Sequence, residues 1–253
     1  MSLGVYLYCI VKSSQYFVIQ HRGMHGRDIY SIPYRSLEAI VSDLAGRTVD
    51  IREENILLHD QVVEEAMQHG TVLPVRFGTV FHGREMVVSL LRKYYSMFER
   101  KLSELEDKVE FGLKIIWPGE QLKAKINAEQ QNSQLWTNQT ESTPGKQYLL
   151  KKLREYRIQR SLEEQADKLI GDIDAELRLY AEAGRLSKLR TERLLLDAVY
   201  LVRKEQYKNY QEKVEQIKQK FPSLKFLSSG PWPPYNFAGF EQPLSIGDSV
   251  SLP

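Results

Sequence analysis

The first half of the chain combines short runs of β-branched and aromatic residues with longer stretches whose apolar positions recur at helical spacing. The run VYLYCIV at 5–11 predicts a strand, and further strands are expected near 28–33 and 37–43. Residues 52–69 place several apolar side chains near one helical face, with acidic residues in the first turn and Gly70 directly after the last. The pattern therefore begins with strands and continues with a helix.

The segment TVLPVRFGTVF, residues 71–81, predicts a strand, and a second helix is expected after it over 84–107. Within a strand, Val75 and Phe77 share one face and Arg76 points to the opposite face. We therefore expect Val75 and Phe77 in the core and Arg76 paired with a carboxylate at the other face. No nucleophile and base are spaced around Arg76 as in an active site, so we interpret the segment as a scaffold strand.

The second half of the chain predicts the order β–α–β–α–β. Strands are expected at 109–117, at 192–204 and from residue 224, and helices at 147–182 and 205–221. This order is compatible with a ferredoxin-like layer of helices on a sheet.

These patterns predict an α+β chain of two domains. The first is a mixed α/β domain at 1–108, and the second is a ferredoxin-like domain with a long helix at 109–253. Residues 120–146 are rich in Gln, Asn, Thr and Ser, which predicts a mobile loop. The tail from residue 230 is aromatic and proline-rich, and its last part, 241–253, is expected to be weakly ordered.

The long helix carries an apolar stripe and segregated charges. The stripe predicted to be buried comprises Leu149, Leu153, Tyr156, Leu162, Ala166, Leu169, Ile173, Leu177 and Tyr180. Basic residues gather at its start, among them Lys151, Lys152 and Arg154, and acidic residues follow later. That order opposes the helix dipole, which favours anions at the start. Two interpretations stay open: a solvated face, or a basic patch kept for a partner.

Composition argues against a transmembrane protein and against a disulfide-stabilised protein, and it excludes little else. The formal net charge of +2 over 253 residues is too small to argue for nucleic acid. Cys9 is the only cysteine, so no intrachain disulfide forms and a reducing cytoplasm fits best. No apolar run approaches the length of a transmembrane helix.

The sequence offers no specific catalytic, metal or cofactor motif. Neither GxGxxG after a strand nor GxxxxGK[ST] is present. His21 and His25 are four residues apart, but a metal site needs three or four convergent ligands. A catalytic Cys9 would need a paired histidine, a pairing that the sequence leaves open, and the ordinary interpretation of a cysteine in a strand is a small buried thiol. We expect no enzymatic activity, no metal and no cofactor, and an enzyme with an unrecognised site stays as a hypothesis.

A second hypothesis is an RNA-binding ferredoxin-like module. Such a sheet can expose aromatic side chains for base stacking, and the candidate strands contain Phe111, Tyr200 and Phe226. The strand VEFGLKIIW does not match the aromatic and basic pattern of RNA-recognition strands. Packing in the core is the simpler explanation of these aromatics.

Several motifs together resemble the gas vesicle protein F/L family (GvpF/GvpL). They are VYLYCIV, YRSLEAIVSDL, LLHDQVVEEAMQHGTVLPVRFGTVF, EFGLKIIW, TPGKQYLLKKLR and LSSGPWPPYNF, which run from residue 5 to about residue 237. The resemblance implies a two-domain fold with a ferredoxin-like C-terminal domain. It also implies a cytoplasmic accessory or minor structural protein, associated with gas vesicles and involved in their nucleation or assembly. The implied partners are the hydrophobic shell protein GvpA and other accessory proteins, with no nucleic acid and no lipid membrane.

Two segments are candidate partner contacts, because Trp, Tyr and Arg are enriched in binding hot spots. One is the aromatic segment with Trp232, Tyr235 and Phe237, followed by Phe240. The other is the basic start of the long helix, with Lys151, Lys152 and Arg154. For the aromatic segment, an alternative is that it packs back over the second domain as an ordered tail.

Overall fold

The structure is a computed structural model, and it divides the chain into two compact units. It describes residues 3–13, 19–119, 121, 123–124, 126–128, 143–187 and 194–239. The first unit comprises Met1–Phe111 and the chain from Gly230 on, and the second comprises Gly112–Ser229. The chain therefore leaves the first unit within one strand and returns to it within another.

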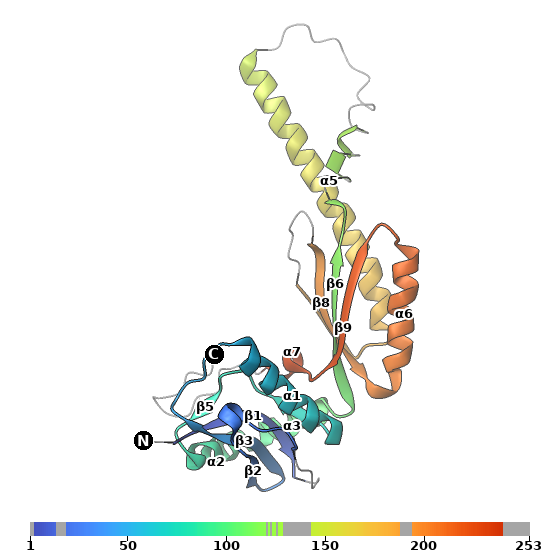
Figure 1. Cartoon of the computed structure of the whole chain (residues 1–253). Helices are drawn as coiled ribbons and strands as arrows, with labels where there is room; N and C mark the ends of the chain where they lie inside the picture. The colour runs from blue at the N-terminus through green and yellow to red at the C-terminus, as the bar shows by residue number, and fades with distance from the viewer. Residues whose placement is uncertain are drawn as a thin grey trace. The chain divides into compact units, whose positions relative to one another are not determined.

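The first unit is a sheet with helices around it (Figure 1). Its elements are β1 (Leu3–Lys12), η1 (Met24–Gly26), β2 (Ile29–Tyr34), β3 (Leu37–Ala45), α1 (Glu53–His69), β4 (Val72–Pro74), β5 (Val80–Phe81), α2 (Arg84–Lys93), α3 (Tyr95–Glu104) and α7 (Tyr235–Ala238). The sheet order is β2-β3-β1-β4, and β5 also pairs with β1. The pairings of β1 with β3, β4 and β5 are all antiparallel.

The run VYLYCIV forms the central strand of this sheet. Residues Val5 to Val11 of β1 are all buried. Helices α1 and α3 both pack against this strand, and α2 packs against β2, β3 and β5. A strand covered on both faces has a continuous apolar run, which explains why the sequence does not alternate here.

The segment at 71–81 is not one strand, so that prediction is wrong. The Val75 N–H still donates to the Tyr8 carbonyl, and the Thr79 carbonyl accepts from the Leu7 N–H, but the backbone between them leaves the strand and turns at Gly78, where φ is +86°. Arg76 is exposed, and its side chain has no ion-pair partner in the described part of the chain. The predicted carboxylate partner is therefore absent among those residues. Val75 is half-buried, and Phe77 is half-buried against the core of the first unit.

The helix predicted at 84–107 is two helices, α2 and α3. Tyr94 separates them with φ −110° and ψ 18°, outside the helical region. Its N–H still donates to the Leu90 carbonyl at 3.0 Å, and its carbonyl accepts from Phe98 at 2.9 Å. The hydrogen-bond ladder thus continues across a change in direction, which apolar spacing alone does not reveal.

The second unit has the ferredoxin-like order β–α–β–β–α–β. Its elements are β6 (Lys108–Ile116), α5 (Pro144–Arg178), β7 (Ala183–Ser187), β8 (Leu194–Arg203), η2 (Lys204–Gln206), α6 (Tyr207–Lys220) and β9 (Lys225–Trp232). The sheet order is β7-β8-β6-β9, and α5 and α6 pack on β8 (Figure 1). The predicted α+β, ferredoxin-like class is confirmed. The sequence prediction lacked β7, a five-residue strand with no fully buried residue.

The loop predicted at 120–146 is shorter than expected at both ends. Described residues between 119 and 128 are helical, and α5 already begins at Pro144. Thr143 caps α5, because its side-chain oxygen accepts from the Lys146 N–H at 3.4 Å, and proline is well suited to the first helical turn. Residues 129–142 lie outside the described residues, as does the tail at 241–253.

The buried stripe of α5 begins later than predicted. Its buried residues are Ile158, Leu162, Ala166, Ile170, Ile173 and Leu177. Leu149, Leu153 and Tyr156 are exposed, so their predicted burial is wrong. The first part of α5 extends beyond the sheet of its unit, where no element of the described chain covers it (Figure 1).

The aromatic tail from residue 230 belongs with the first unit, whereas the sequence placed it in a second domain beginning at 109. The cause is a set of contacts between α7 and the first unit: α7 packs against β4, and the Asn236 side chain donates to the Glu110 carboxylate. Among the described helices of both units, none is both long and apolar enough to cross a membrane.

Candidate functional site

His59 lies at the centre of a buried hydrogen-bond chain in the first unit. Its Nε2 is 3.1 Å from the Val75 carbonyl, which only accepts, so Nε2 carries the proton. The Tyr6 hydroxyl donates to Nδ1 at 2.9 Å and accepts from the Gly78 N–H at 3.1 Å. Burial lowers the pKa of His59 to about 4, against a smaller opposite effect of the hydrogen bond to Val75. The imidazole is therefore a neutral cross-link between α1, β1 and residues 75–78.

A second set of polar contacts fixes the segment between β1 and β2. Glu65 accepts the Gln20 N–H at 2.7 Å, and its other oxygen lies 2.6 Å from Nδ1 of His21. The hydroxyl of Tyr8 accepts the Met24 N–H at 2.8 Å. These contacts use the His21 ring to hold a loop, which accounts for a histidine that spacing alone made a weak metal candidate.

The described residues hold no metal-binding cluster, and their cysteine is not activated as a nucleophile. Cys9 is fully buried, and burial raises the pKa of its thiol, so the reactive thiolate is disfavoured. No group of three or more His, Cys, Asp or Glu side chains that could hold a metal occurs in the part of the chain that the structure describes.

The aromatic segment around α7 is largely used inside the first unit. The Tyr235 hydroxyl donates to Asp60 at 3.0 Å, and its ring centroid lies 6.2 Å from that of His59. Phe237 is only 7% exposed, so it packs in the interior and offers no contact surface. Trp232, at 43% exposure, is the member of the predicted trio that stays accessible to a partner.

Glu110 anchors the same segment from β6. Its carboxylate accepts the backbone N–H of Asn236 at 2.8 Å and the side-chain amide at 2.5 Å. Glu110 is 5% exposed, and a buried carboxylate requires such donors. The motifs HGTVLPVRFGTVF and GPWPPYNF are thus both held by α1, through His59 and Asp60, and the second is also held by Glu110 of β6.

The basic start of α5 lies on the surface of the second unit. Lys151, Lys152 and Arg154 are all exposed. Lys152 pairs with Glu155 at 2.9 Å, an exposed contact worth little in water. The structure thus leaves these three cations accessible, which is what a partner-contact surface needs.

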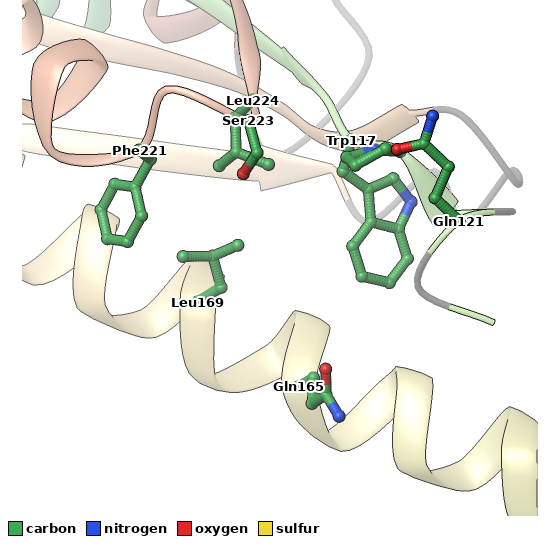
Figure 2. A pocket seen from close by; sticks show the side chains of 8 residues that line it. Trp117, Gln121, Gln165, Leu169, Phe221, Ser223 and Leu224 are labelled. Atoms are coloured by element: carbon green, nitrogen blue, oxygen red, sulfur yellow. The ribbon is translucent and has the colours of Figure 1, made fainter. Parts of the chain in front are cut away.

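A groove of about 370 Å³ lies in the second unit, between α5 and the chain around α6 (Figure 2). Leu169 of α5 faces Phe221 and Leu224 across it, and Trp117 closes one end. The Trp117 Nε1 is buried and has no hydrogen-bond partner among the described residues. The groove is mainly apolar, and its size would accept a few side chains of a partner.

The aromatic residues proposed for base stacking do not form an exposed platform. Phe111 and Tyr200 are buried, at 2% and 0% exposure, and Phe226 is half-buried. Tyr200 instead donates to Asp174 of α5 at 3.0 Å. Core packing accounts for these residues, so their placement does not favour the RNA-binding hypothesis.

Sequence reasoning missed the role of His59, although a signal was present. His59 is followed by Val62, Val63 and Ala66 at helical spacing, and all four are buried. The predicted face of α1 comprised Ile56, Val63, Ala66 and Met67. Val63 and Ala66 are buried, whereas Ile56 is exposed and Met67 is half-buried. A histidine in register with a buried stripe indicates a satisfied internal contact.

The sequence comparisons agree on one family. A family model described as "Gas vesicle synthesis protein GvpL/GvpF" matches residues 4–239. Gas vesicle protein F1 of Halobacterium salinarum is 24% identical over 242 residues, covering 94% of this chain and 93% of that protein. Gas vesicle protein L of a Streptomyces species is 29% identical over 191 residues, covering 73% of this chain and 68% of that protein.

Solved structures match the fold over nearly the whole chain. The crystal structure of gas vesicle protein GvpF from Anabaena sp. PCC7120 superposes with a TM-score of 0.80 at 24% identity, covering 95% of this chain and 98% of that one. The crystal structure of GvpF from Microcystis aeruginosa superposes with a TM-score of 0.78 at 21% identity, covering 94% of this chain and 99% of that one. Both likenesses concern the fold.

Proposed function

The chain belongs to the gas vesicle synthesis protein family GvpL/GvpF, and on that premise we propose that it takes part in gas vesicle assembly by binding the shell protein GvpA. A strongly apolar shell subunit aggregates unless its surface is covered before incorporation. In this proposal the chain binds GvpA in the cytoplasm, keeps it from aggregating, and works with other gas vesicle accessory proteins. The family match across residues 4–239 is the observation that carries the proposal.

The surface of the chain supports a binding role. Large apolar side chains are exposed at the start of α1, where Ile51 is 84% and Leu57 is 52% exposed. Another exposed group lies on α5, and Trp232 is exposed in the tail segment. Exposed apolar residues grouped on regular elements are typical of protein contact sites.

An aggregation assay tests the proposal directly. Freshly diluted GvpA is followed by light scattering with and without the purified full-length chain. We expect suppression of scattering near equimolar ratio, and co-elution of the two proteins on a sizing column. A folded protein of similar size and net charge serves as control and should leave the scattering unchanged.

Genetic and binding results together decide the outcome. The proposal is overturned if the chain neither binds GvpA nor slows its aggregation, and if cells lacking the chain still form normal vesicles. A Trp232→Ala variant locates the contact: because Trp232 is exposed, its loss should weaken binding while leaving the fold intact.

A further inference from the structure

The first part of α5 is a helix on which no described element of its own unit packs. Every residue from 144 to 157 is exposed, and Ile158 is the first buried one. At 1.5 Å per residue, this part is about 20 Å long. An isolated helix of this length is marginally stable in water, so a partner that packs on it would add stability.

Five large apolar side chains are exposed on this part of α5: three form a seam, and Tyr148 and Leu150 lie on either side of it. Leu149, Leu153 and Tyr156 are 67%, 43% and 62% exposed, and their spacing of four and three places them in one line. Ile158 follows Leu149 by nine residues, which is about 180° around a helix at 100° per residue. The seam therefore points away from the side on which Ile158 packs with Ile126 of its own unit.

Basic side chains surround the seam. Residues 144–160 carry six basic residues and one acidic residue. Lys146 lies three residues before Leu149, and Arg160 lies four residues after Tyr156. Both therefore continue the line of the seam, one at each end. Lys152 and Arg157 adjoin Leu153 and Tyr156, at the flanking positions that choose the partner in paired helices.

We propose that this surface binds an acidic amphipathic helix of another protein. The apolar side chains of the partner helix pack on the seam, and its carboxylates pair with the flanking Lys152 and Arg157. The inference rests on the proposed function only in that it takes the partner to be a gas vesicle protein. It names the surface and the chemistry of the partner, which the family does not specify.

Charge and the exposed apolar residues favour an acidic partner helix over a second copy of the chain or a nucleic acid. A second copy of the chain would bring two basic seams together, and like charges repel. The phosphate backbone of a nucleic acid would pair with the cations but would leave the exposed leucines without an apolar contact. Tyr148 and Leu150 are exposed on either side of the seam, so an anionic lipid surface is the competing occupant, and the vesicle measurement below decides between them.

The test uses the full-length chain and two synthetic peptides. Each peptide is about three heptads long, with leucine at the core positions and either glutamate or lysine at the flanking positions. Binding is followed by fluorescence anisotropy of the labelled peptide at several salt concentrations. We expect the glutamate peptide to bind, with an affinity that falls as salt rises, and the lysine peptide not to bind.

Two variants and one control locate the contact. Leu153→Glu should weaken binding of the glutamate peptide about tenfold or more. Lys151→Glu introduces the same residue with a larger change of charge, but on the far side of the helix, about 200° from Leu149, and should cost about twofold or less. The double change Lys152→Glu and Arg157→Glu should reverse the preference, so that the lysine peptide binds. All these positions are exposed, so circular dichroism should show unchanged folding.

The outcomes separate this inference from the proposed function. Absence of glutamate-peptide binding, or binding that Leu153→Glu and the charge reversal leave unchanged, overturns the inference. Tighter binding to anionic vesicles or to poly(U), or self-association by sedimentation that Leu153→Glu abolishes, assigns the seam to another occupant and also overturns it. If GvpA is captured equally by wild type and the double variant, the surface is wrong but the proposed function stands. If the peptide result holds and GvpA is not bound, the proposed function fails alone.

Discussion

The Tyr235 hydroxyl donates a hydrogen bond to the Asp60 carboxylate over 3.0 Å, joining two positions 175 residues apart. With the contact of Asn236 to Glu110, it fastens α7 to the first unit. Both carboxylates belong to elements formed early in the sequence, so the stability of the first unit depends on residues near the far end of the chain.

Tyr235→Phe should destabilise the first unit by about 1–2 kcal/mol. The change keeps the ring but removes the hydroxyl that holds the Asp60 carboxylate, whose pKa is already raised by burial. The free energy of unfolding from urea denaturation measures the loss. Tyr148→Phe is the matched control, because Tyr148 is exposed at the start of α5, and it should be neutral. Equal stability of the two variants would contradict the prediction.

Stability should fall as pH is lowered from 7 to 5, because His59 must be protonated on unfolding. Its pKa is lowered from 6.5 to about 4 in the folded state, so the unfolded chain binds the extra proton. The contribution of neutral His59 to the free energy of unfolding is present above pH 6.5 and is lost as the pH falls from 6.5 to 4. At pH 5 the loss is about 2 kcal/mol. Thermal melts across this range measure it.

His59→Gln is the control for that pH dependence. Glutamine keeps one acceptor for Tyr6 and one donor for Val75 but does not titrate. Its stability should no longer fall between pH 7 and 5, because Asp60 and Glu64, whose pKa values are raised by burial, stabilise the fold when they bind protons. Glu65, whose pKa is lowered by hydrogen bonds that outweigh burial, loses its contribution only below 4.5, outside this window. An unchanged slope in His59→Gln would refute the assignment.

Two substitutions at Asn236 should differ in how much they destabilise the first unit and in how that loss depends on pH. Asn236→Ala removes the amide that bonds to Glu110 and should cost about 1–2 kcal/mol. Asn236→Asp places a carboxylate where the amide nitrogen lies 2.5 Å from Glu110, so repulsion adds to the loss. Because protonation relieves that repulsion, lowering the pH should recover part of the stability of Asn236→Asp but not of Asn236→Ala. Parallel pH profiles for the two variants would argue against the contact.

Two glycine substitutions should change the free energy of unfolding in opposite directions. Gly171 lies inside α5, and a methyl group added to its Cα would meet no atom of the described chain within 4 Å, so Gly171→Ala should stabilise the chain by about 0.5–1 kcal/mol. Gly230 has φ +114°, and a Cβ there would lie 2.7 Å from the Glu110 carbonyl oxygen. Gly230→Ala should therefore destabilise by about 1–3 kcal/mol. Chemical denaturation of both variants gives the comparison.

Local patterns predict most elements, because their signals lie within short windows of sequence. The pattern places helix α1 within one residue, since acidic residues start it and Gly70 ends it. The break at 75–79 is not predictable in this way, because it depends on contacts of Tyr6 and His59 with distant backbone. The edge strand β7 lacks buried residues and so carries little signal.

The candidate site is predictable only in part. The basic start of α5 is visible in the sequence, because charge is a local property. The exposure of Leu149, Leu153 and Tyr156 is not, since periodicity indicates an apolar face without saying whether anything covers it. The same limit applies to Phe237, which is apolar in sequence and buried only because the tail returns to the first unit.

The second unit interrupts the first in sequence, and this fixes the order in which a ribosome can complete them. Asp60 and Glu110 are synthesised early, but Tyr235 and Asn236 follow only after the whole of Gly112–Ser229 has been translated. At about 5–20 residues per second, the nascent first unit remains open for several seconds, with both carboxylates lacking these donors. A chain truncated at Ser229 would lack the Tyr235 and Asn236 donors, so its first unit should be less stable and should be cleaved by proteases faster than that of the complete chain.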